Sequence, residues 1–195
     1  SEAALNLSLR VARAVDNQNS NEDERSFARI STAISKYWIT KRAPYLVFEA
    51  LECHGGPGYI EESIMPRLYR EAPLNSIWEG SGNVMCLDVL RALQRDKNAL
   101  PALFNELASA KGSNKNFDES FSQLKETLQD PIDLEIEARL ITEKMACLIQ
   151  ASIFIKSGEE EKVSAFCNSR LGPRWSGAFG TLPNETNFDN IINGF

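Results

Sequence analysis

The sequence predicts an all-α fold. Apolar residues recur with the period of an amphipathic helix along most of the chain, and no segment alternates apolar and polar residues as a half-buried strand does. The 195 residues are enough for one domain with its own core, or for a domain with a small appendage. A content of 43% hydrophobic and 25% charged residues is typical of a globular protein.

The first two predicted helices form a hairpin. A polar segment at residues 16–21 connects them, and Ser20 or Asn21 is expected to cap the second helix. The second helix continues to about Glu52, with a bend at Pro44, because proline removes one helical hydrogen bond and clashes with the preceding turn. The apolar faces of the two helices consist of Leu7, Val11 and Val15, and of Phe27, Ile30, Ile34 and Tyr37.

Glycine and proline interrupt the helical pattern between residues 55 and 77. Residues 55–58 have the sequence GGPG, which cannot stay helical and ends the preceding helix. Residues 59–77 are expected to be irregular, with breaks at Pro66 and Pro73. A new helix follows over residues 82–95, and its wide apolar face predicts deep burial.

The second half of the chain predicts shorter helices, one long helix and a tail. The shorter helices cover residues 100–110 and 117–128. Asp130 and Pro131 form a suitable cap and first turn for a long helix, whose apolar stripe runs from Leu134 to Ile155. A last helix at 159–170 precedes a tail rich in glycine, proline and asparagine, which Trp175 and Phe179 are expected to anchor on the bundle.

Composition excludes several classes of function. A net charge of -6 gives no electrostatic argument for binding a nucleic-acid backbone. The single histidine and the four widely spaced cysteines indicate neither a metal site nor a disulfide framework, and reduced thiols are expected. No apolar run is long enough to span a membrane, and the N-terminus lacks a secretory pattern. These features predict an intracellular protein, in the cytoplasm or the mitochondrial matrix.

Two loops combine glycines with polar side chains: residues 52–59, ECHGGPGY, and residues 76–83, SIWEGSGN. Glycine-rich turns at helix ends present backbone N–H groups to anions, and the second loop leads directly into a helix N-terminus. A phosphate-bearing ligand is one interpretation. The other is that the glycines only end one helix and turn the chain.

Glu79 is the candidate catalytic residue. Its neighbour Trp78 can exclude water, and Gly80 leaves room for a substrate. Desolvation raises a carboxyl pKa toward the range useful for proton abstraction near neutral pH. The alternative is a solvated or helix-capping glutamate.

Residues 67–71, RLYRE, carry two arginines that could bind phosphate. Alternating charges around a tyrosine favour an internal ion-pair network instead.

Residues 49–93 strongly resemble the C-terminal domain of acyl-CoA dehydrogenases, and within that family the AidB branch of DNA-alkylation-response proteins. The resemblance rests on the order of three elements: the GGPGY loop, the YREA segment at 69–72 and the WEGS turn at 78–81. A weaker similarity runs from about Ala4 through KYWITKRAP at 36–44. The resemblance implies an up-and-down helical bundle at residues 1–96, followed at 97–195 by a helical extension and an irregular tail.

The resemblance also implies roles for the two loops. Glu79 would remove a proton alpha to a thioester carbonyl while hydride passes to the flavin of FAD, and Gly80 would lie beside the thioester of an acyl-CoA. The FAD-facing residues would be Glu52, Gly55, Gly56, Ser81 and Asn83, with Gly55 and Gly56 often reaching the flavin of another subunit. A homotetramer is implied, and the electron acceptor is left unspecified.

Several departures from the family pattern affect these expectations. Glu52 stands where many relatives have glutamine, and Ser81 and Asn83 replace threonine and a longer polar side chain. A carboxylate at position 52 would repel pyrophosphate unless it is turned away or paired. The family's N-terminal helical and middle β domains have no counterpart here, so we expect a fragment that alone neither binds FAD tightly nor turns over acyl-CoA.

Three functions therefore compete. The first is part of an acyl-CoA dehydrogenase, and the second is a flavin-containing AidB-type protein in which DNA binding matters more than dehydrogenation. Few basic residues follow position 160 to support DNA binding. The third is a structural oligomerisation bundle, which leaves the WEGS turn without a purpose.

Overall fold

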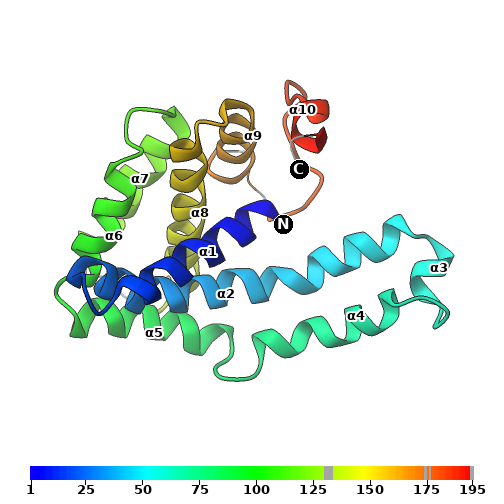
Figure 1. The fold of residues 1–195 in the computed structure, drawn as a ribbon, viewed down its shortest axis with the longest axis horizontal. Helices are drawn as coiled ribbons and strands as arrows, with labels where there is room; N and C mark the ends of the chain where they lie inside the picture. Colours follow the sequence, from blue (N-terminus) through cyan, green and yellow to red (C-terminus); the bar gives the residue numbers. More distant parts are fainter. Residues whose placement is uncertain (130–133, 174, 176, 194–195) are drawn as a thin grey trace.

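The computed structural model describes residues 1–129, 134–173, 175 and 177–193, and within them it contains helices and no strand. The all-α prediction is confirmed (Figure 1). The elements are α1 Glu2–Asn17, α2 Glu22–Cys53, α3 Gly56–Tyr59, α4 Met65–Glu71, the 3-10 helix η1 Ala72–Ser76, α5 Gly82–Arg95, α6 Ala99–Ala108, α7 Lys115–Gln129, α8 Ala138–Ser157, α9 Glu160–Arg170 and α10 Phe188–Asn193.

Helix α2 organises the molecule. Asn21 caps it as predicted, because the Asn21 side chain accepts a hydrogen bond from the Glu24 backbone N–H at 3.2 Å. Its first half is buried against α1, α5, α6 and α8, whereas its second half, beyond Pro44, projects from the bundle. Helix α3 lies at the far tip of this projection, and α4 and η1 return alongside α2 (Figure 1). We call this projection, from Tyr45 to Ser76, the arm.

The arm corrects two predictions from the sequence. Residues 59–77 are largely helical, because Pro66 and Pro73 lie in the first turns of α4 and η1, where a missing N–H costs no helical hydrogen bond. The GGPG segment ends α2, but its last three residues and Tyr59 form the single turn of α3. The prolines therefore begin helices here.

The core is continuous from α1 to α9. Helix α8 crosses the bundle and packs on α1, α2, α5, α7 and α9, so Leu148 and Met145 share one apolar cluster with Leu7 and Ile34. The proposed boundary between domains at residue 96 stays a prediction. Helix α8 begins at Ala138, later than expected, and Leu134 lies in the turn before it. The predicted cap at Asp130 and Pro131 lies outside the described residues.

The tail contacts the bundle through the two predicted aromatic anchors. The Trp175 indole N–H donates a hydrogen bond to Glu143 on α8 at 2.7 Å. The Arg42 guanidinium lies 5.1 Å from the Trp175 ring centroid and 4.3 Å from that of Phe179. The tail also forms α10, a short helix that its composition did not predict.

The cysteines are free thiols in this structure. Cys86, Cys147 and Cys167 are buried, and Cys53 is exposed. Within the described part of the chain, no helix is long and apolar enough to cross a membrane.

Candidate functional site

The turn between η1 and α5 holds Glu79 in an unusual backbone conformation. Glu79 has φ 55° and Gly80 has φ 115°, so two successive residues have positive φ. Lys36 on α2 stabilises this turn, because its Nζ donates hydrogen bonds to the carbonyl oxygen of Trp78 and, at 3.1 Å, to that of Gly80. The turn is therefore fastened to α2 on both sides of Glu79.

The Glu79 side chain is exposed and makes no hydrogen bond or ion pair with any residue that the structure describes. Trp78 beside it is 54% exposed, and its indole N–H donates to Asn75 at 3.3 Å. The sequence suggested that Trp78 would exclude water from Glu79, yet this chain leaves both side chains open. Any desolvation of Glu79 must come from a ligand or from another part of the protein.

Gly80 and Gly82 both lie in this turn, and only Gly80 has a positive φ. A Cβ on Gly80 would lie 2.5 Å from the Met85 Cε, in addition to the strain of its positive φ. Gly82 is buried at the start of α5, and a Cβ there would approach the Tyr37 ring at 3.4 Å. The two glycines allow the chain to enter α5 close to α2.

Ser81 and Asn83 lie at the N-terminus of α5, next to Glu79. Ser81 is the exposed N-cap of α5, and its side chain makes no capping hydrogen bond to the described residues, so its hydroxyl stays uncommitted there. The Asn83 Oδ1 accepts a hydrogen bond from the Arg139 Nε at 3.0 Å. Helix α8 of the extension thus reaches the same turn.

Glu52, Gly55 and Gly56 lie at the opposite end of the arm (Figure 1). Gly55 has φ 62° and ψ -141°, a conformation essentially restricted to glycine, and it lets the chain leave α2. No described atom lies within 4 Å of a Cβ built on Gly55 or Gly56, so both backbones are open to a close approach. Helix α4 and η1 separate these residues from Glu79, and the two loops form no common site within one chain.

The two arginines of residues 67–71 form ion pairs. Arg67 Nε lies 2.8 Å from Glu71 Oε1, and Arg70 Nη1 lies 2.6 Å from Glu61 Oε1. Both arginines are paired with carboxylates as expected, but all four side chains are exposed, so the prediction that the network is internal was wrong.

No sequence motif indicated that Lys36 and Arg139 support this turn. Lys36 is 42 residues before Trp78, and Arg139 is 56 residues after Asn83, so neither lies near the motif that it supports. A lysine or arginine on a helix normally indicates a solvated face, and only the packing of α2 and α8 on α5 brings these two to the turn.

Comparison with known proteins agrees with this geometry. Residues 1–94 match the family model described as acyl-CoA dehydrogenase, C-terminal domain. The chain is 39% identical over 173 residues to putative acyl-CoA dehydrogenase AidB of Escherichia coli. The chain belongs to the acyl-CoA dehydrogenase family. The likeness to AidB covers 89% of the chain and so extends beyond residue 94 into the extension.

Other members of the acyl-CoA dehydrogenase family share this fold. The chain is 35% identical over 113 residues to acyl-CoA dehydrogenase family member 11 of Caenorhabditis elegans, which covers 58% of the chain and 18% of that relative. The crystal structure of Caenorhabditis elegans ACDH-11 in complex with C11-CoA superposes with a TM-score of 0.74 at 26% identity, over 87% of this chain and 34% of that one. The chain spans only 31% of the length of AidB.

The geometry of the turn predicts that Gly80→Ala destabilises the protein by about 1–3 kcal/mol, because a non-glycine residue is strained at this φ and its Cβ would displace Met85. Thermal unfolding of the variant checks this. Gly56→Ala is the matched control, because Gly56 has an ordinary φ and open space around it. Equal melting temperatures for the two variants would contradict the account of the turn.

Proposed function

We propose that this chain supplies the catalytic base and part of the flavin site of an FAD-dependent acyl-CoA dehydrogenase. Glu79 removes the proton alpha to the thioester carbonyl of an acyl-CoA, and Gly80 leaves space for that thioester. The observation that carries the proposal is the turn itself. It presents a carboxylate without a partner among the described residues, on a backbone that Lys36 holds in place.

The residues present are compatible with FAD. Bound flavin would supply the chemistry of accepting the hydride from the β-carbon. Ser81 offers an uncommitted hydroxyl at the N-terminus of α5, and Gly55 and Gly56 offer backbone that a dinucleotide phosphate can approach. The hydrogen bond from Arg139 fixes the position of the Asn83 side-chain amide. Glu52 is exposed, so its carboxylate can turn away from a pyrophosphate that it would otherwise repel.

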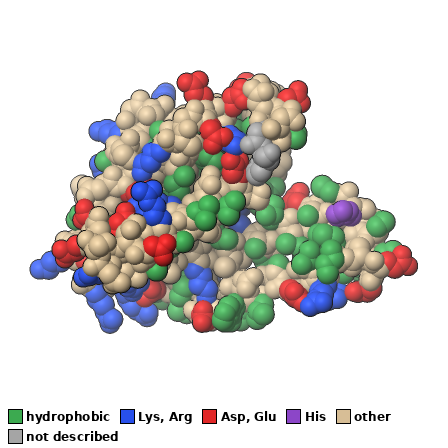
Figure 2. All heavy atoms as spheres, in the orientation of Figure 1, with side chains coloured by type: hydrophobic (Ala, Val, Ile, Leu, Met, Phe, Trp, Pro, Cys, Tyr) green, Lys and Arg blue, Asp and Glu red, His purple; other side chains and the backbone are tan. Residues whose placement is uncertain are grey.

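We propose that the two loops serve different flavins in a homotetramer. They lie at opposite ends of the arm, so one chain cannot bring Gly55 and Gly56 to its own Glu79. The arm also exposes large apolar side chains, which Figure 2 shows gathered over its surface. Those between α3 and the turn after η1 are Tyr59, Ile60, Ile64, Leu68, Tyr69, Leu74, Ile77 and Trp78. A second copy of the chain would cover this face and assemble the complete site.

Replacing Glu79 tests the proposal. In the full-length protein, Glu79→Gln keeps the shape of the side chain but removes the base, so bleaching of the flavin by acyl-CoA in a single turnover should slow by 10²-fold or more. Stopped-flow absorbance across a panel of acyl-CoAs measures it. Glu126→Gln on α7 is the control, because Glu126 is exposed and remote from the turn. An equal rate of flavin bleaching in the wild type and in Glu79→Gln would contradict the assignment of Glu79 as the base.

Replacing Ile64 tests the assembly. Ile64 is 59% exposed, so Ile64→Asp should leave the subunit folded but break the tetramer into smaller species. Sedimentation velocity on the full-length protein measures the change. Leu9→Asp on α1 is the control with the same exposure, and it should leave the assembly intact. A tetramer that survives Ile64→Asp would argue against the arm as the interface.

The similarity to AidB across the extension favours one alternative, a flavin-containing protein of the DNA-alkylation response with little dehydrogenase activity. The same bleaching experiment separates the two proposals. A flavoprotein that no acyl-CoA bleaches would support the alternative, whereas rapid bleaching that requires Glu79 would support the dehydrogenase.

A further inference from the structure

A cavity lies away from both the Glu79 turn and the tip of the arm. It is a cavity of about 360 Å³ between the N-terminus of α1, the middle of α2, the helices α8 and α9, and the tail. This volume is within the range of small-molecule sites, roughly 300–1,000 Å³. Its wall is mainly apolar, with side chains that include Ile39, Leu46, Phe154, Phe166, Leu182 and Ile191. None of the residues predicted to face FAD or acyl-CoA lines it.

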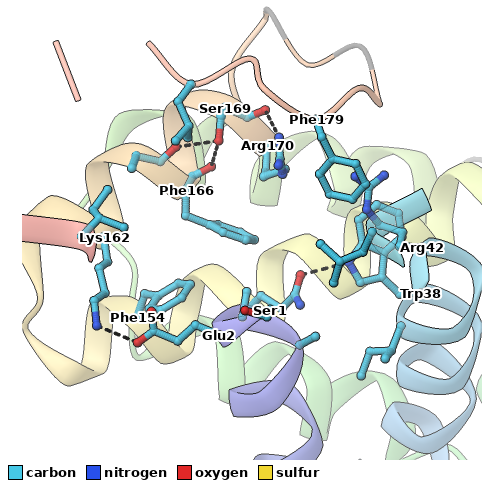
Figure 3. Close-up of a pocket in the computed structure, with 18 of the residues that line it drawn as sticks. Ser1, Glu2, Trp38, Arg42, Phe154, Lys162, Phe166, Ser169, Arg170 and Phe179 are labelled. Carbon is cyan, nitrogen blue, oxygen red and sulfur yellow. Dashed lines mark hydrogen bonds and ion pairs between the residues drawn. The ribbon is translucent and has the colours of Figure 1, made fainter. Parts of the chain in front are cut away.

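Two guanidinium groups line this cavity. Arg42 from α2 and Arg170 from α9 both lie against aromatic rings, and Figure 3 shows them on the same side of the cavity as Phe179. Neither forms an ion pair with a carboxylate among the described residues. Arg42 donates one hydrogen bond, from Nη1 to the Gly177 carbonyl at 3.2 Å, and its Nη2 is buried without a partner in the described part of the chain.

An unpaired buried guanidinium atom is costly, because burial removes water without replacing its hydrogen bonds. Burial lowers the pKa of Arg42 and of Arg170, and the positive charge of Arg42 lowers the pKa of Arg170 further. An anion bound between the two guanidinium groups would supply the carboxylate-like partner that neither group has among the described residues. The polar side of the cavity is therefore suited to bind a negatively charged group.

The nearby charges favour an anion with a single charge. Glu143, which accepts from Trp175, is the carboxylate that acts most directly on Arg42, and burial raises the pKa of the adjacent Cys147 to about 12, so that thiol is neutral. Two guanidiniums and one carboxylate leave one positive charge. At the other end of the cavity, Lys162 lies 2.6 Å from Glu2 and 2.5 Å from Glu159, so one ammonium faces two carboxylates and a second anionic group is disfavoured there.

We infer that this cavity binds an amphipathic monocarboxylate, with its carboxylate on Arg42 and Arg170 and its apolar body along α2, α8 and α9. The guanidinium of Arg170 donates to one carboxylate oxygen, and the guanidinium of Arg42 donates to the same carboxylate. Phe166, Phe154 and Leu46 surround the apolar body. The inference does not depend on the proposed dehydrogenase activity, because the cavity shares no residue with the Glu79 turn.

Isothermal titration of the full-length protein with decanoate tests the inference. We expect one decanoate per chain, at least tenfold weaker binding of decanol, and at least tenfold weaker binding of decanoate to Arg170→Met. Arg170→Lys keeps the charge and should retain most of the affinity. Arg91→Met, on the exposed side of α5, is the matched control and should bind normally.

A second variant distinguishes the loss of decanoate binding from a folding defect. Ala4→Phe places a ring in the cavity from α1 without changing any charge, and it should abolish decanoate binding while circular dichroism stays unchanged. The absence of decanoate binding to the wild type, or equal binding of decanol, would overturn the inference. So would tighter binding of decyl phosphate, or decanoate binding that shifts the flavin spectrum and competes with acyl-CoA, which would place the ligand in the flavin site.

Discussion

The hydrogen bonds from Lys36 to the carbonyls of Trp78 and Gly80 are the constraint on which the candidate site depends. A glutamate with positive φ is disfavoured by roughly 1–2 kcal/mol, so the turn needs external support to keep this shape. Lys36 can supply that support because its neighbours Ser35 and Tyr37 are buried in the core, which fixes this part of α2. The packing of the bundle thereby sets the position of Glu79.

The same helix links three distant features. Its buried half carries Lys36, its middle carries Arg42 beside the second cavity, and its end leads through Gly55 to the tip of the arm. The extension contributes residues at two of these places. Arg139 of α8 hydrogen-bonds to Asn83 beside the turn, and Arg170 of α9 lies on the same side of the cavity as Arg42. The extension is therefore packed into the bundle that bears the turn, and the core they share explains why.

The sequence predicted what local pattern controls. The bounds of α5 and the Asn21 cap follow from periodicity and capping chemistry, which need only neighbouring residues. Pro66 and Pro73 were misinterpreted because proline ends a helix in its interior but begins one in its first turn, and only the following residues decide between the two. Leu134 fits the apolar stripe of α8 yet precedes the helix.

The sequence motif of the candidate site was predictable, but the residues that hold the turn in place were not. Trp78, Glu79 and Gly80 are adjacent in the sequence, whereas Lys36 and Arg139 reach them only through packing between distant helices. The exposure of Glu79 was also unpredictable, because the sequence placed Trp78 next to it without fixing where the indole points. Tertiary contacts, which no local pattern encodes, decide all three.

The most direct test of the central claim is the structure of the full-length protein with flavin and an unreactive acyl-CoA analogue. The account predicts that a carboxylate oxygen of Glu79 lies about 3–3.5 Å from the α-carbon of the acyl group, with Lys36 still bonded to the turn. A different carboxylate at the α-carbon, or Glu79 directed into solvent while the acyl group is bound, would contradict it.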